Sequence, residues 1–341
     1  MATSLLPICI AAALLYHLGY AWARMLLPPD LTADRWLWMP LIGFALFTVV
    51  VAPLTNLTAL TPVQIAVGMA IVAIPLNGLA WWRTRRQPLP PGRRSHGLFI
   101  LTLALLVCLG ALTPVLRYGP APIGENWDVS EFYLPLGRAL QSYSQRDFFL
   151  LPDNPVVRIL TTPPVNARIH AFSYLHATVS AWSGVESLHS FPALMAMFLA
   201  LSVPAMALLS RSLGLRQSAI WLAAALAGMN WLLLWTTYNG FAMHATAFAL
   251  LPAALAATLA VLRLERLHDT SGARVTLLGK AGAVHHAGLS FSLAIGQRLP
   301  HISGSALLRE ILTAGLLVGG LALAYQPALT AYVCWVAALV G

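Results

Sequence analysis

Charged side chains are scarce in this sequence of 341 residues: only 9% are Asp, Glu, Lys or Arg, whereas 59% are hydrophobic. Soluble domains carry about 25% charged residues, so this composition excludes an ordinary soluble protein. Apolar runs of roughly 20 residues, long enough to cross the hydrocarbon core of a bilayer, recur along the whole chain. The scarcity of charge therefore predicts an all-α fold class, a polytopic bundle of transmembrane helices.

Cysteine is scarce too, and Cys9, Cys108 and Cys334 all lie inside apolar runs. Their spacing excludes a zinc site and does not indicate a disulfide framework. The sequence also lacks a Gly-rich phosphate loop, a nucleophile elbow and a His-Glu-x-x-His pattern, which argues against cytosolic ATP chemistry. No basic residues precede the first apolar run, which argues against a cleaved signal peptide.

Acidic residues are fewer than basic ones, and the 11 acids against 20 bases give a formal charge of +9. The basic residues stand between apolar runs, where they orient a membrane protein rather than bind nucleic acid. The most basic stretch is the Pro-rich linker 83–94, Arg-Thr-Arg-Arg-Gln-Pro-Leu-Pro-Pro-Gly-Arg-Arg. By the positive-inside rule this linker is cytoplasmic, and we expect no nucleic-acid partner.

This orientation predicts a topology for the whole chain. The expected membrane segments are 4–23, 36–54, 62–82, 97–116, 192–209, 219–237, 241–262, 311–325 and 328–340. A long external loop covers 117–189, in which 170–182 is too short to span and is expected to lie as a helix in the membrane interface. On this topology the outside holds only the arginines at 117, 138, 146, 158 and 168, which supports the orientation. For the stretch 276–305 we expect a pair of amphipathic cytoplasmic helices.

The chain divides into two parts on this interpretation. Residues 1–96 form the N-terminal transmembrane helices and the basic linker, and 97–341 form a core that carries the external loop. The last apolar segment ends at Gly341 without a closing charge, so we expect the gene product to continue beyond it. The predicted location is a multi-pass position in a bacterial inner or plasma membrane, with the active face outside.

Three of the few acids gather in the external loop. Glu125, Asp128 and Glu131 lie within Gly124–Tyr133, beside Trp127 and two further aromatic residues. A carboxylate near hydrocarbon is partly desolvated, which raises its pKa toward the range useful for proton abstraction. Asp and Glu at this spacing are also a capping box that would open a helix over 129–142. Both interpretations of the acids stay open.

The motif and its surroundings resemble a known family. Trp127-Asp-Val-Ser-Glu-Phe-Tyr-Leu-Pro-Leu136 is similar to a Trp-Asp-x-x-x-x-x-Leu-Pro pattern of bacterial GT-C glycosyltransferases. A cytoplasmic turn, Leu-Leu-Ser-Arg-Ser-Leu-Gly-Leu-Arg, and an external Tyr-Asn turn follow in the order found in that superfamily. The superfamily includes protein O-mannosyltransferases and the lipid A aminoarabinose transferase. The resemblance covers about 97–341, and the first three spans fall outside it.

The resemblance implies an inverting transfer of a sugar from a polyprenyl-phosphate carrier to a lipid, glycan or protein acceptor on the outer face. It implies that Asp128, or else Glu131, takes the acceptor proton. Arginine's planar fork suits the departing phosphate, which makes the external Arg158 and Arg168 candidates for holding it. Further candidate substrate contacts are His170, His176, Tyr238, Asn239, His244, Tyr325 and Gln326.

Structural alternatives exist for several of these residues. His170 and His176 fit polar contacts at headgroup level, His244 can snorkel from a helix end, and Tyr325 fits an interfacial anchor. The sequence predicts no definite cofactor, although the acids of the motif could supply oxygen ligands to a divalent cation.

Two other function classes remain open. One is a non-catalytic GT-C-like membrane subunit, or a protein that binds or transports lipid-linked glycans. The other is a secondary transporter, which needs polar residues near the bilayer midplane. The expected spans hold few of these: His17, Gln64, Asn77 and Asn230.

Overall fold

The computed structural model describes residues 2–27, 29–85, 94–119, 129–148, 171–272, 304–324 and 326–340. Every regular element in these residues is helical, which confirms the all-α fold class. Nearly all of the stretch 276–305, for which two helices were expected, lies outside them.

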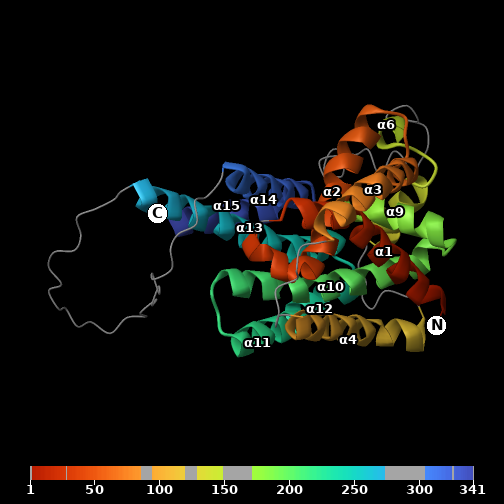
Figure 1. The fold of residues 1–341 in the computed structure, drawn as a ribbon. Helices are drawn as coiled ribbons and strands as arrows, with labels where there is room; N and C mark the ends of the chain where they lie inside the picture. Colours follow the sequence, from red (N-terminus) through yellow and green to blue (C-terminus); the bar gives the residue numbers. More distant parts are fainter. Residues whose placement is uncertain are drawn as a thin grey trace.

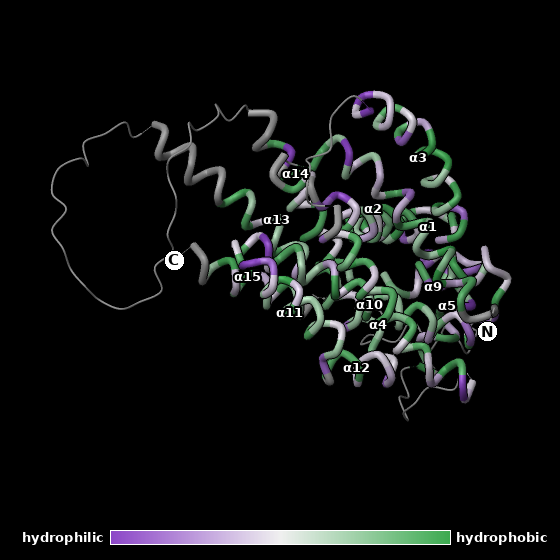
Figure 2. Tube along the Cα trace, turned by 60° about the horizontal axis from the view of Figure 1, so that its bottom comes forward, coloured by the Kyte–Doolittle hydropathy of each residue, from purple (hydrophilic) through white to green (hydrophobic). Residues whose placement is uncertain are grey.

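Seven helical segments of the described residues are long and apolar enough to cross a membrane, which confirms the prediction of a polytopic helical protein. They lie in α1 (Ala2–Met25), α2 (Arg35–Leu57), α3 (Pro62–Thr84), α4 (Arg94–Tyr118), α10 (Ser187–Ser212), the pair α11 (Gln217–Gly228) and α12 (Trp231–Tyr238), and α13 (Ala242–Gly272). The shorter apolar stretches 311–324 and 328–337 follow in α14 (Gly304–Ala324) and α15 (Gln326–Val340). Large hydrophobic residues of α3 and α4, among them Ile71 and Leu105, are exposed, as expected for helices that face lipid; Figure 2 shows where hydrophobic residues lie along the helices.

Helix α2 lies at the centre of one half of the bundle and is buried over most of its length. It crosses α1 at a reciprocal pair of glycines: a Cβ on Gly43 would lie under 3.0 Å from the Leu15 backbone oxygen, and one on Gly19 equally close to that of Met39. On the other side of α2, a Cβ on Gly320 of α14 would lie 2.8 Å from the Ala45 Cβ, so these two helices also approach closely. Small residues let helix backbones approach where lipid offers no hydrophobic driving force.

Helix α10 lies at the centre of the other half, with α4 and α13 on either side of it (Figure 1). The rings of Phe44 on α2 and Phe198 on α10 meet edge to face at 4.7 Å and join the two halves. One hydrophobic core therefore contains residues on both sides of the proposed division at residue 96.

The expected segment 219–237 is not one uninterrupted helix. It breaks between α11 and α12 at Asn230, whose side-chain oxygen accepts hydrogen bonds from the backbone N–H groups of Leu232 (2.8 Å) and Leu233 (3.4 Å). Asparagine is a favoured N-cap residue, because its side chain satisfies the donors that open a helix. The polar side chain within an apolar run is the cause of the break.

The short helix expected over 170–182 exists as α9 (Ala171–Ser183), but its surroundings differ from the expectation. All of 171–180 is buried, against α1, α2, α3, α5 and α10. A helix lying on a bilayer surface would leave one face uncovered by protein, and the first three turns of α9 leave none. Helix α9 is thus a core element enclosed by other helices.

Candidate functional site

Several candidate residues lie outside the described residues: Glu125, Asp128, Arg158, Arg168, His170 and Tyr325. Glu131 and Gln326 have helical backbones, but their side chains are not among those described. The structure therefore describes the helices that pack next to the acidic motif. It also describes the candidate residues His176, Tyr238, Asn239 and His244.

Val129, the first described residue after Asp128, is helical. A π-helical turn, η2 (Val129–Tyr133), leads into α5 (Leu134–Ala139), and α6 (Gln145–Phe148) follows. The helix expected over 129–142 is present from Val129 to Ala139 among the described residues, so it ends sooner than residue 142. The cap by Asp128 itself stays a prediction.

The aromatic residues of the motif are packing anchors. Phe132 and Tyr133 are buried, and the Tyr133 ring lies 5.9 Å from that of Phe191 on α10 and 6.3 Å from that of Phe172 on α9. Large aromatic side chains contribute much of the burial energy where an element attaches to a core. These contacts fix the motif helix on α9 and α10, with Val129 as its first described residue.

The turn at Tyr238–Asn239–Gly240, between α12 and α13, packs against the start of the motif helix. Gly240 has φ +69°, and a Cβ at this position would come under 3.0 Å from Val129 Cγ2. Two segments about 110 residues apart that the sequence singled out are therefore adjacent. The side-chain amide of Asn239 donates to the Trp235 oxygen at 2.9 Å, and His244 is half-buried with its ring 5.5 Å from Phe241.

We expect Gly240→Ala to displace Val129, and Asp128 with it, because alanine disfavours this φ and its Cβ has no space. If the chain carries out the sugar transfer that the resemblance implies, the rate of that transfer should fall at least tenfold, with a smaller loss of stability of about 1–2 kcal/mol. Gly119→Ala is the matched control, because Gly119 has φ +96° but no atom of the described residues lies within 4 Å of the place that a Cβ would take. The transfer rates of both variants are measured on membranes with matched expression. Equal losses in Gly240→Ala and Gly119→Ala would show that the contact between Gly240 and Val129 has no role in the reaction.

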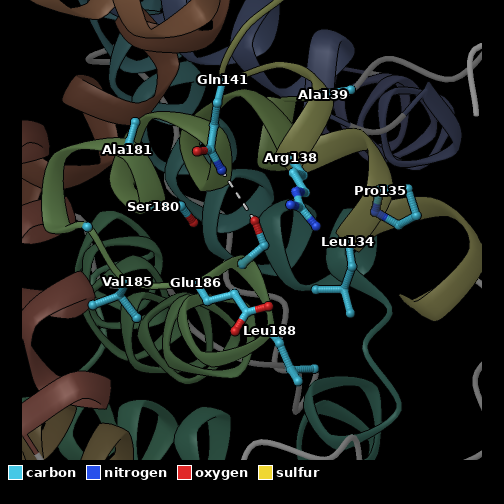
Figure 3. Close-up of a pocket in the computed structure, with 12 residues that line it drawn as sticks. Leu134, Pro135, Arg138, Ala139, Gln141, Ser180, Ala181, Val185, Glu186 and Leu188 are labelled. Carbon is cyan, nitrogen blue, oxygen red and sulfur yellow. Dashed lines mark hydrogen bonds between the residues drawn. The ribbon is translucent and has the colours of Figure 1, made fainter.

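A pocket of about 930 Å³ lies beside the motif helix, between α5, the end of α9 and the start of α10 (Figure 3). Its polar lining consists of Arg138, Gln141, Ser180, Glu186 and Ser187, and its apolar lining includes Leu134, Pro135, Val185 and Leu188. Arg138 and Glu186 are exposed. A pocket with apolar walls and a few polar groups can bind a small molecule and fix its orientation.

The turn between α9 and α10 supplies the acidic side of this pocket. Gly184 has φ +64°, which turns the chain after α9, and Glu186 stands at the N-cap of α10 without a side-chain cap bond. Figure 3 shows its carboxylate beside the pocket. Gln141 on the opposite wall donates to the Ser187 hydroxyl at 3.3 Å, which connects the motif segment to α10.

His176 lies behind the pocket and is fully buried. Its Nε2 lies 3.0 Å from both the Ser187 backbone oxygen and the Ser190 hydroxyl, and Ser190 in turn bonds Ser180 at 2.5 Å. Burial lowers the pKa of His176 to about 4, so the ring is neutral at pH 7. Its polar contacts are inside the protein, whereas the sequence suggested contact with substrate or with lipid headgroups.

The sequence interpretation missed three pocket residues as site candidates, namely Arg138, Gln141 and Glu186. Arg138 and Gln141 are three residues apart and follow the acidic motif directly, a spacing that places two side chains on one face of a helix. Glu186 gave no such signal, because its place opposite them depends on how α9 and α10 pack. Among the described residues no group of three metal-ligating side chains occurs.

Comparison with known proteins gives no match: no family model, no curated protein and no solved structure matches this chain. The resemblance to GT-C enzymes stays a prediction based on the motif and the layout.

Proposed function

We propose that this protein is an integral membrane glycosyltransferase of GT-C type. It transfers a sugar from a polyprenyl-phosphate carrier to an acceptor on the outer face of a bacterial inner or plasma membrane. The main support is the packing of the acidic-motif helix against the Gly240 turn, next to a pocket at one end of a bundle of apolar helices.

The distribution of charge supports an external position for this end. At the opposite ends of the helices, Arg24 donates from Nη1 to the Thr84 hydroxyl at 3.0 Å, and Arg211 pairs with the buried Asp34. These contacts hold together the ends that lead into the basic linker and the basic turn 211–216. By the positive-inside rule the basic ends are cytoplasmic, so the pocket opens outside.

In the proposed reaction Asp128, with Glu131 as the alternative, takes the proton of an acceptor hydroxyl. The acceptor oxygen attacks the anomeric carbon of the sugar, and the bond from that carbon to the phosphate oxygen breaks. The polyprenyl phosphate departs with the electron pair, and the configuration at the anomeric carbon inverts. Arg158 and Arg168 hold the departing phosphate, and the pocket adds Arg138 as a further cation.

The test is turnover by the purified wild-type chain, reconstituted in vesicles, with a panel of polyprenyl-phosphate sugars and mass spectrometry of the products. We expect one carrier to be consumed with release of polyprenyl phosphate. A folded chain that consumes none of them contradicts the enzyme, and co-purification of a lipid-linked glycan would then favour a binding or transport protein.

Arg138→Gln should lower kcat/KM about tenfold, because it removes a charge-assisted contact to the phosphate. Arg146→Gln is the matched control, since Arg146 is exposed on the neighbouring α6 and does not line the pocket. Equal kcat/KM in both variants and the wild type would remove Arg138 from the site.

The polar residues of the spans give no support to a secondary transporter, because each has a structural role. Gln64 forms a capping box with Thr61 at the start of α3, with bonds of 3.2 and 3.0 Å, and Asn230 caps α12. His17 and Asn77 bond each other at 3.1 Å. None of the four is left to bind an ion at the midplane, where transporters place their sites.

A further inference from the structure

A second pocket lies at the other end of the bundle, away from the proposed active site. Helices α1, α2 and α3 enclose about 380 Å³ there, with Tyr16, Tyr20, Trp36 and Trp81 among its walls. Trp36 is 50% exposed and Trp81 is 54% exposed, so the outer walls face the surroundings of the bundle rather than its core. Because these three helices are membrane spans, the pocket is a groove that opens sideways toward lipid.

The floor of the groove is a network of hydrogen bonds between α1 and α3. The Asn77 amide donates to His17 Nδ1 at 3.1 Å, so the proton of His17 lies on Nε2, which donates to the Ala70 oxygen at 2.9 Å. The same amide accepts from the Ala21 N–H and donates to the His17 backbone oxygen, both at 3.0 Å. The floor groups are satisfied by one another, which fixes the shape of the groove.

Two arginines lie next to residues that line the groove: Arg24 contacts Tyr20, and Arg35 directly precedes Trp36 in the chain. Neither arginine has a carboxylate partner among the described residues. The Arg24 guanidinium lies 5.1 Å from the centre of the Tyr20 ring and donates from Nη1 to the Thr84 hydroxyl, but its buried Nε has no hydrogen-bond partner among the described residues. Arg35 is buried, donates from Nε to the Thr32 oxygen at 3.1 Å, and lies near the Arg24 cation. The ion pair found in the described part of the chain joins Arg211 and Asp34 instead. Two neighbouring cations with an unsatisfied donor are complementary to an anion.

The depth of the groove distinguishes a lipid from a small soluble anion. Arg24 and His17 are seven residues apart on α1, which corresponds to about 10 Å along the helix. A small anion at the arginines would leave that length unfilled, whereas a lipid chain would cover it. Tryptophan and tyrosine at a helix end are also typical of the headgroup level of a bilayer.

We propose that this groove binds a lipid with an anionic phosphate headgroup, in the leaflet opposite the proposed active site. The phosphate contacts Arg24 and Arg35, and one hydrocarbon chain lies along Tyr16, Trp36 and Trp81 above the His17–Asn77 floor. The bound lipid neutralises the two arginines and ties α1, α2 and α3 together at this end. The proposal does not depend on the glycosyltransferase reaction.

The test is photolabelling of the full chain in phosphatidylcholine vesicles that contain a small fraction of phosphatidic acid with a diazirine in one acyl chain. We expect labelled peptides to contain Tyr16, Tyr20 or Trp36, and excess unlabelled phosphatidic acid to compete. Arg24→Gln should lower this labelling about tenfold, because a charged hydrogen bond to the phosphate is lost. Arg85→Gln is the matched control, since Arg85 is exposed at the end of α3 with its guanidinium 5.7 Å from the Trp81 ring.

The outcomes separate the sources of the anion. Equal labelling in the wild type and Arg24→Gln, or equal losses in Arg24→Gln and Arg85→Gln, would overturn the site and leave ordinary annular lipid. Full competition by soluble glycerol phosphate would overturn the lipid and leave a phosphate site. If Arg24→Gln does not purify as a folded protein, Trp81→Ala replaces it, because loss of an exposed wall should still lower labelling at Tyr16 and Tyr20 severalfold. Unchanged labelling in that variant contradicts the groove.

Discussion

Asp128→Asn is expected to lower turnover of the lipid-linked sugar by about 10²–10⁴-fold, the usual contribution of a general base. The Asp128 carboxylate is the first candidate to take the proton from the acceptor hydroxyl, with Glu131 as the alternative, and an amide cannot accept that proton. Binding should change much less, because the amide keeps the size and most hydrogen bonds of the acid. We therefore expect the loss in kcat, with KM within severalfold of the wild type. Initial rates on reconstituted wild type and variant, at saturating carrier, give this comparison.

The choice of asparagine separates catalysis from helix capping. Asparagine is about as good an N-cap as aspartate, so Asp128→Asn would keep the predicted cap of the helix whose first described residue is Val129. Asp128→Ala removes both the base and the cap and should also lose about 1 kcal/mol of stability. A full rate in Asp128→Asn, with that stability loss in Asp128→Ala, would make Asp128 a structural cap only. A large loss in Glu131→Gln would then move the base to Glu131.

The membrane segments could be predicted from the sequence because the signal is local. A run of about 20 apolar residues carries its own length and its own solvent preference, whatever its neighbours are. The helix break at Asn230 could also have been predicted from the sequence, because a lone asparagine in an apolar run is a capping signal. What no local pattern contains is the pairing of helices, such as the crossing of Gly19 and Gly43.

The sequence predicted which segments belong to the candidate site, but not how these segments pack against one another. The motif drew attention to the segment that begins at Val129, and the Tyr-Asn turn to Gly240, but only the fold brings the two together. His176 illustrates the limit most clearly. His170, Ser173 and His176 on an apolar segment too short to span suggested a helix in the membrane interface. In the structure, Gly137, Ser187 and Ser190 from other elements enclose the His176 ring instead.

Gly43→Ala is expected to destabilise the bundle by about 3 kcal/mol or more, near the upper end of the range for overpacking. An alanine Cβ at this position would overlap the backbone oxygen of Leu15, which cannot turn away as a flexible side chain can. The whole of α1 would have to move from α2, and Gly19 would lose its close contact with Met39 in the same step. Unfolding in mixed dodecyl maltoside and SDS micelles, followed by near-UV circular dichroism, measures the change.

Gly68→Ala provides the control with the opposite sign. Gly68 is an exposed residue of α3 with nothing within 4 Å of a Cβ, so alanine there should stabilise the helix by about 0.5–1 kcal/mol. The same substitution thus raises stability on a lipid-facing surface and lowers it at a backbone crossing, and helix propensity alone cannot produce both. If Gly43→Ala is as stable as Gly68→Ala, α1 and α2 do not cross at Gly19 and Gly43. Gly43 lies one helical turn from Met39, which lines the groove proposed to bind lipid. Because Gly43→Ala would move α1 away from α2, it should also weaken photolabelling at Tyr16 on α1.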